Sequence, residues 1–216
     1  HELWTNTVER SILANRSSAQ RYSNKSFEEY EGEQLEKLFL GRKASCAGRG
    51  LWYNGSPSHN VLGGAALNNC WFLTLDKLEA FVMAQDYLML GGGVGVSVEH
   101  RFVCKLPNVK QGVVVKHVNR KDADFIVPDS REGWNELTRL CFDSFFLTGH
   151  SFSFSTVIVR GAGTPIKGFG GLSSGPIPLV DCINTISNIL SNRAGKHVRP
   201  IDCADLICAI ADMVIA

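Results

Sequence analysis

The chain has 216 residues, of which 44% are hydrophobic and 20% charged, with 22 basic residues against 21 acidic ones. This composition is typical of a folded globular protein and excludes a chain too polar to bury a core. The balanced, scattered charge argues against nucleic-acid binding, and the apolar runs are far shorter than the ~20 residues that span a bilayer.

The seven cysteines are odd in number and widely spaced, without the CxxC pairs of zinc ribbons or thioredoxin-like sites. This pattern predicts free thiols in a reducing compartment, so we expect a cytoplasmic protein. The six histidines show no metal-ligand spacing, and no HExxH, GxSxG or P-loop motif occurs. We therefore expect no metal site, hydrolase or NTPase.

The first part of the chain, residues 1–45, is predicted to be a helical region. Trp4, Val8 and Leu13 fall near helical spacing among polar residues. After it, Gly, Ser, Asn and Pro surround residues 51–53, which predicts loops around a brief strand.

The chain stops at Ala216 inside a predicted helix with no capping residue, so we expect a fragment.

The rest of the chain, residues 46–216, alternates strand and helix patterns. The predicted strands are 70–75, 94–99, 112–118, 125–127 and 151–159. The predicted helices are 77–90, 130–148, 179–193 and one that begins near residue 202. This order indicates an α/β fold whose parallel strands are joined by helical crossovers.

Three segments could carry chemistry, and the first places Cys70 after two amides at the start of a predicted strand. From this segment alone, a packed core cysteine is the favoured interpretation, because free cysteines are among the most buried residues. A redox role would require a partner cysteine within about 4.4 to 6.8 Å between Cα atoms, and sequence spacing identifies none.

The second and third segments are rich in glycine. Residues 91–95 join a predicted helix to a strand, the reverse of the dinucleotide-binding order, so they indicate either a tight turn or a substrate contact. Residues 168–178 precede a predicted helix, where free amides and the helix dipole favour an anion. Composition alone slightly favours a capped loop without a ligand there.

In this order, these segments resemble the monomeric class II ribonucleotide reductases, which depend on adenosylcobalamin. The similar segments span nearly the whole chain. They are residues 2–4 and 7–10, 48–52, 68–72, 91–95, 128–134, 168–178, 192–196 and 202–205.

The resemblance implies that the chain forms part of a ten-stranded α/β barrel. In this family a cofactor-generated thiyl radical activates the ribonucleotide, a cysteine pair reduces it, and a thioredoxin-like dithiol protein regenerates the pair. The resemblance implies that the substrate is a ribonucleoside triphosphate and that the effector is a deoxynucleotide. It also implies that the protein is a monomer and that adenosylcobalamin is bound mainly by parts absent from this chain.

The resemblance also assigns residues. Cys70 is implied to be the first member of the reducing pair, and the effector is implied to contact Glu79, Asp86 and Leu90 of the helix before the triple glycine. The residues implied to hold or border the substrate are Asn69, Gly92, Gly93, Ser174, Gly175 and Ile177.

The chain departs from the family pattern in two respects. The Asn-Pro-Cys-x-Glu motif of the radical cysteine and the second reducing cysteine are absent, and the stretch between Glu99 and Asp129 is shorter than the family insertion. Two alternatives therefore stay open. One is a reductase-like module that only binds nucleotides, and the other is a reductase with a different radical source.

Overall fold

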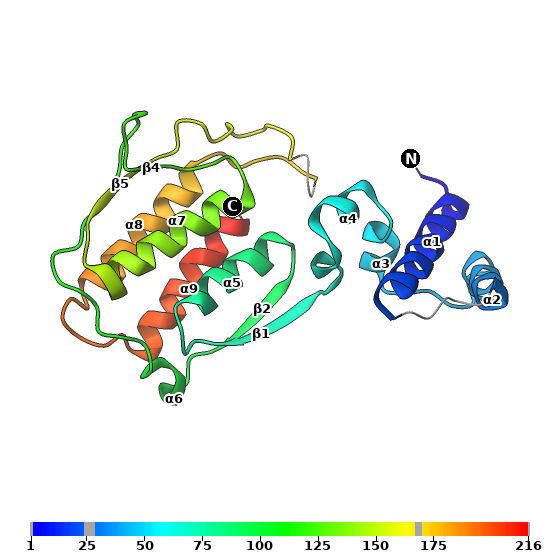
Figure 1. Ribbon diagram of the computed structural model, residues 1–216, viewed down its shortest axis with the longest axis horizontal. Helices are drawn as coiled ribbons and strands as arrows, with labels where there is room; N and C mark the ends of the chain where they lie inside the picture. The colour runs from blue at the N-terminus through cyan, green and yellow to red at the C-terminus, as the bar shows by residue number, and fades with distance from the viewer. Residues whose placement is uncertain (1, 24–28, 167–169, 216) are drawn as a thin grey trace. The chain divides into compact units, whose positions relative to one another are not determined.

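A computed structural model describes residues 2–23, 29–166 and 170–215, and from Cys70 onward the predicted strands and helices occur in the predicted order (Figure 1). The chain divides into two compact units, residues 1–69 and 70–216. The predicted helical region lies wholly within the first unit. The domain boundary predicted at residue 46 falls inside the first unit. This unit continues through further short helices and ends at Asn69.

The described part of the first unit contains helices and loops but no strand. Its two long helices lie within the predicted helical region and pack through Val8, Ile12 and Phe39. The elements of this unit are α1 (Trp4–Ser23), α2 (Glu29–Leu40), α3 (Gly48–Tyr53), α4 (Pro57–Leu62) and the 3₁₀ turn η1 (Gly64–Leu67).

The strand predicted at residues 51–53 is wrong, since these residues end helix α3. A strand needs a neighbour to satisfy its backbone groups, whereas the last carbonyls of a helix can be satisfied by side chains. Here the Arg10 guanidinium donates to the carbonyls of Leu51 and Asn54. The Tyr53 side chain is buried and its hydroxyl donates to the Gly63 carbonyl.

The second unit contains the predicted alternation of strands and helices. Its elements are β1 (Cys70–Thr74), α5 (Glu79–Met89), β2 (Gly93–Ser97), α6 (His100–Val103), β3 (Val115–His117), β4 (Phe125–Ile126), α7 (Arg131–Asp143), the π-helical turn η2 (Ser144–Thr148), β5 (Phe152–Ser155), α8 (Ile177–Ser191) and α9 (Pro200–Ile215).

All strand pairs in the described chain are parallel, apart from a single antiparallel bridge between Pro165 and Leu172. One sheet has the order β1–β2 and the other the order β3–β5–β4. These pairings confirm the mixed α/β class and the parallel strands. The described residues of this chain form two small sheets and no barrel, so the barrel expectation goes beyond the observed fold.

The core of the second unit is one continuous apolar cluster. Helices α5, α7, α8 and α9 lie alongside one another and pack together (Figure 1). Phe142 is fully buried on α7, and its ring stacks on Phe81 of α5 with centroids 4.8 Å apart. The predicted helix 130–148 is confirmed to Asp143 and then widens into η2, which ends at Gly149 with φ of 75°.

Candidate functional site

The start of strand β1 presents Cys70 at the surface. Cys70 is exposed, and in the parallel register of the two strands it lies opposite Gly93 at the start of β2. The buried core cysteine favoured by the segment alone is therefore wrong for this thiol. Pairing of β1 with β2 instead brings together two of the predicted site residues, which are 23 positions apart in the sequence.

Behind this edge, an aromatic stack fixes the turn that carries the glycines. The Trp71 and Tyr87 rings stack at 4.0 Å between centroids and are nearly parallel, with an 11° interplanar angle. A Cβ built on Gly92 would meet the Trp71 ring at 2.8 Å and the Tyr87 carbonyl at 3.0 Å. Gly92 is thus explained by close packing against Trp71, a role that the sequence pattern did not identify.

The glycine-rich segment after β5 folds back on itself before α8. Gly163 donates its backbone N–H to the Ser173 carbonyl at 2.8 Å, and Ser173 donates to the Thr164 carbonyl at 2.9 Å. Gly175 is buried with φ of 81°. Residues 167–169, including Gly168 of the predicted anion loop, lie outside the described residues.

This segment leads directly into helix α8. Ser174, just before the helix, is half-buried, and Ile177, the first residue of the helix, is exposed. Pro176 occupies the N-cap and supplies no side-chain hydrogen bond. The first amides of α8 therefore lack a side-chain cap, which is the condition for an anion to bind there. The hydrogen bonds of Ser173 and Gly175 stay within their own segment.

The base of the same segment is tied to the start of α7. Arg160 donates to both carboxylate oxygens of Asp129, at 2.9 and 3.0 Å, and to the Pro165 carbonyl at 3.2 Å. Both of these carboxylate contacts come from Arg160 Nε, so the two oxygens share one N–H, and Nη2 donates in addition to the Asp129 carbonyl at 3.3 Å. Sequence reasoning marked 128–134 only as a similar segment and did not assign Asp129 or Arg160 a role.

The three residues predicted to contact an effector differ in their surroundings along α5. Glu79 is exposed in the first turn, whereas Leu90 is 3% exposed. Asp86 accepts hydrogen bonds from Arg131 at 2.6 Å and from Asn135 at 2.5 Å. The carboxylate is thus already paired with α7, and Arg131 and Asn135 are its sequence-distant partners.

Polar atoms without partners gather at this contact between α5 and α7. Gln85 accepts from the Thr138 hydroxyl at 2.6 Å, and both residues are fully buried. Gln85 Nε2, Arg131 Nε and Asn135 Oδ1 are buried without a hydrogen-bond partner in the described part of the chain. This contact therefore has unused hydrogen-bonding capacity. A buried polar atom without a partner lowers the stability of the fold, and a ligand that pairs with it would remove that cost.

The cysteines are either buried or exposed, apart from Cys46, which is half-buried. All seven are free thiols. Burial raises the pKa of Cys141, Cys182 and Cys203 to about 12, so these thiols stay protonated and unreactive at neutral pH. Cys70, Cys104 and Cys208 are exposed, and of these Cys70 alone lies in a predicted site.

Neither a metal centre nor a membrane segment is present among residues 2–23, 29–166 and 170–215. Within these ranges, no group of three or more His, Cys, Asp or Glu side chains is placed to hold a metal ion. No helix there is both long and apolar enough to cross a bilayer.

Comparison with known proteins connects these features to a family. A family profile described as the insertion domain of B12-dependent ribonucleotide reductase matches residues 97–190. The adenosylcobalamin-dependent ribonucleoside-triphosphate reductases of Lactobacillus delbrueckii subsp. bulgaricus and Lactobacillus leichmannii are each 31% identical to this chain over 270 aligned positions. Each alignment covers the whole chain and 36% of the relative.

A solved structure gives the same relationship. The crystal structure of a B12-dependent (class II) ribonucleotide reductase superposes with a TM-score of 0.89 at 27% identity, covering all of this chain and 38% of that one. The chain thus spans little more than a third of the length of these relatives. Because 270 aligned positions face 216 residues, the relatives carry at least 54 positions without a counterpart here.

Proposed function

Because this chain is homologous to the adenosylcobalamin-dependent ribonucleoside-triphosphate reductases over about 36% of their length, we propose that it forms the first part of a reductase α/β barrel. In this proposal the two parallel sheets are segments of the ten-stranded barrel. The reaction is the reduction of a ribonucleoside triphosphate to its 2′-deoxy form, for DNA synthesis.

The observation that carries the proposal is the exposed Cys70 thiol opposite Gly93. Parallel strands place a thiol and a glycine turn at one edge, where a ligand can come close to the backbone. The Trp71–Tyr87 stack holds this edge in place. Asn69, directly before Cys70, and Gly92 and Gly93 contribute substrate contacts in this proposal.

Cys70 supplies half of the reducing equivalents in the proposed reaction. Two thiols that form a disulfide release two electrons and two protons. The substrate takes these up as its 2′-hydroxyl leaves as water and a C–H bond replaces the C–O bond. The second thiol belongs to a part of the enzyme beyond the homologous region, and a thioredoxin-like dithiol protein returns the disulfide to thiols.

The uncapped start of α8 supports a role in binding the substrate. Free amides at a helix N-terminus attract phosphate, and Ser174, Gly175 and Ile177 surround this start. The α5–α7 contact supports a deoxynucleotide effector, because Gln85, Arg131 and Asn135 retain unused hydrogen-bonding atoms beside Asp86. Glu79 and Leu90 complete this effector proposal, in which the enzyme acts as a monomer.

Adenosylcobalamin is the cofactor named for the relatives, and it supplies the radical in the proposed reaction. The described side chains offer no set of ligands suited to a metal ion.

A chimera tests the proposal. This chain replaces the homologous segment of the Lactobacillus leichmannii enzyme, and cobalamin-dependent formation of deoxynucleotide is measured. We expect turnover from the chimera, none after Cys70→Ser, and unchanged turnover after Cys104→Ser, which removes another exposed thiol.

Thiol alkylation of the chain itself keeps the proposal testable when the chimera does not fold. A ribonucleoside triphosphate should slow alkylation of Cys70 and leave the rates at Cys104 and Cys208 unchanged. An inactive folded chimera with intact nucleotide protection would instead support the alternative of a module that only binds nucleotides. Absence of both activity and protection would refute both functions.

A further inference from the structure

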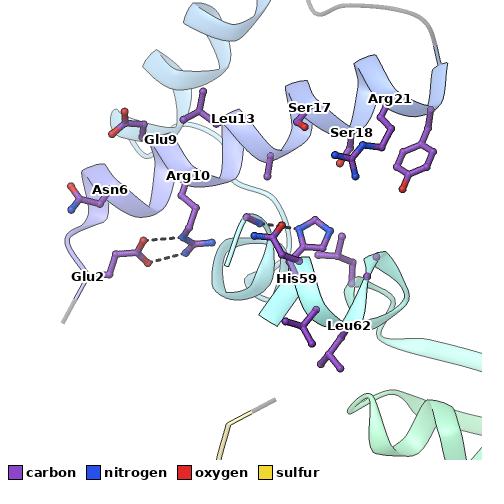
Figure 2. A pocket seen from close by; sticks show the side chains of 18 residues that line it. Glu2, Asn6, Glu9, Arg10, Leu13, Ser17, Ser18, Arg21, His59 and Leu62 are labelled. Atoms are coloured by element: carbon purple, nitrogen blue, oxygen red, sulfur yellow. Dashed lines mark hydrogen bonds and ion pairs between the residues drawn. The ribbon is translucent and has the colours of Figure 1, made fainter. Parts of the chain in front are cut away.

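The first unit carries a groove that the proposed reaction does not use. Its walls are helix α1 and residues 55–67, and its cavity volume is about 1190 Å³ (Figure 2). All lining residues belong to the first unit, so the following inference is independent of the proposed reductase function.

One face of α1 lines this groove. Arg10, Ala14, Ser17, Ser18 and Arg21 recur at three- and four-residue intervals, which places them along one side of a helix. The buried residues Val8 and Ile12, on another side, hold α1 against α2. Figure 2 shows this polar row of α1 opposite the wall that carries His59 and Leu62.

The charge at one end of the row is already neutralised. Arg10 donates to Glu2 through two nitrogens, at 2.9 and 2.8 Å, and to the carbonyls of Leu51 and Asn54. This side chain therefore fastens α1 to α3, and each of its three nitrogens already donates within the first unit.

The other end of the row is a free cationic site. Arg21 is exposed and makes no ion pair with any described residue. The hydroxyls of Ser17 and Ser18, four and three residues before it, likewise have no hydrogen-bond partner in the described part of the chain. A guanidinium beside two hydroxyls is a donor set suited to phosphate.

His59 adds a donor from the opposite wall. Its Nδ1 accepts the backbone N–H of Gly55 at 3.0 Å, and its ring lies 5.4 Å from the Tyr53 ring. With Nδ1 used as an acceptor, the neutral ring carries its proton on Nε2. Nε2 is thus a donor in a groove-lining residue.

Two adjacent glycines leave room for a ligand close to the backbone. Gly63 and Gly64 line the groove, and a Cβ built on either meets nothing within 4 Å. Gly63 has φ of 74°, which explains its identity, but the φ of Gly64 is not in that region. Neither packing nor backbone strain therefore requires glycine at position 64. Nearby, Val61 is 75% exposed and offers an apolar surface.

We propose that this groove binds a small organic phosphate. The phosphate lies among Arg21, Ser17, Ser18 and the Nε2 of His59, and the apolar body of the ligand lies over Gly64 and Val61. Several donors on two walls surround a tetrahedral anion better than they match a planar carboxylate, which a single guanidinium fork satisfies.

Calorimetric titration of the whole chain with phenyl phosphate tests this site. We expect saturable binding that Arg21→Gln weakens about 10- to 100-fold, since a hydrogen bond to a charged group contributes about 1.5–3 kcal/mol. Gly64→Ala should weaken it as well, while leaving the thermal stability of the chain unchanged. Inorganic phosphate and benzoate should both bind more weakly.

Two variants of the first unit are matched controls. Arg42→Gln removes an exposed arginine outside the groove, and Gly48→Ala adds a methyl group to open space outside it. Neither should change binding. Absence of binding by phenyl phosphate, or full affinity in Arg21→Gln, would overturn the site. If benzoate bound as tightly as phenyl phosphate, the preference for phosphate over carboxylate would be refuted. If inorganic phosphate bound as tightly, the proposed contact with the apolar part of the ligand would be refuted.

Discussion

The two compact units solve the problem of stability in different ways. The second unit buries one continuous apolar cluster that includes three cysteine thiols. The first unit buries only Val8, Ile12 and Phe39 in its cluster and connects its helices through polar bridges from Arg10 and Asn54. A small unit with little apolar area relies on directional contacts, whereas a larger one relies on burial.

The largest expected difference between the units appears at alkaline pH. Burial raises the pKa of Cys141, Cys182 and Cys203 from 9.0 to about 12. The stability gained by keeping these thiols neutral is complete below pH 9 and is lost as pH rises from 9 to 12. We therefore expect the second unit to unfold first in an alkaline titration followed by hydrogen exchange and mass spectrometry. Simultaneous loss of protection in both units would contradict this expectation.

A cavity in the larger core should have the next largest effect. Phe142→Ala removes a fully buried ring that stacks on Phe81, and we expect a loss of about 3–5 kcal/mol in the free energy of unfolding. Urea denaturation measures it. Leu147→Ala is the control, since this side chain is 55% exposed and its loss should change stability by less than about 0.5 kcal/mol.

Loss of the polar bridge should destabilise the first unit alone. Arg10→Gln removes the charged donor that serves Glu2, Leu51 and Asn54, at an expected cost of about 1.5–3 kcal/mol. Hydrogen exchange should then increase in residues 2–69 and stay unchanged in residues 70–215. Arg42→Gln, which alters an exposed arginine, should leave both units unchanged. Equal destabilisation of the two units would show that they fold together.

The smallest expected effect tests the turn beside Cys70. Gly92→Ala places a methyl group 2.8 Å from the Trp71 ring, so the Trp71–Tyr87 stack must shift at a cost of about 1–3 kcal/mol. Near-ultraviolet circular dichroism should report the change in the stack. Gly161→Ala, where an added Cβ meets nothing within 4 Å, should leave the spectrum as it is.

The sequence by itself determined the order of the helices and parallel strands, since apolar spacing and glycine placement are local properties of the chain. Residues 77–90 and 179–193 show this, because the structure has helices at both with ends within two residues of those predicted. Local spacing gave the wrong prediction at residues 51–53, because three consecutive apolar residues suit a strand or a helix equally. The helix found there depends on Arg10, 41 residues away from Leu51, which donates a hydrogen bond to the Leu51 carbonyl.

Only the tertiary structure decided which distant residues meet. The exposure of Cys70 and its place opposite Gly93 depend on strand pairing, and the Asp86–Arg131 ion pair depends on the packing of α5 against α7. The groove beside Arg21 likewise needs α1 and residues 55–67 to come together. Such contacts depend on long-range packing and register, which residue spacing along one segment does not encode.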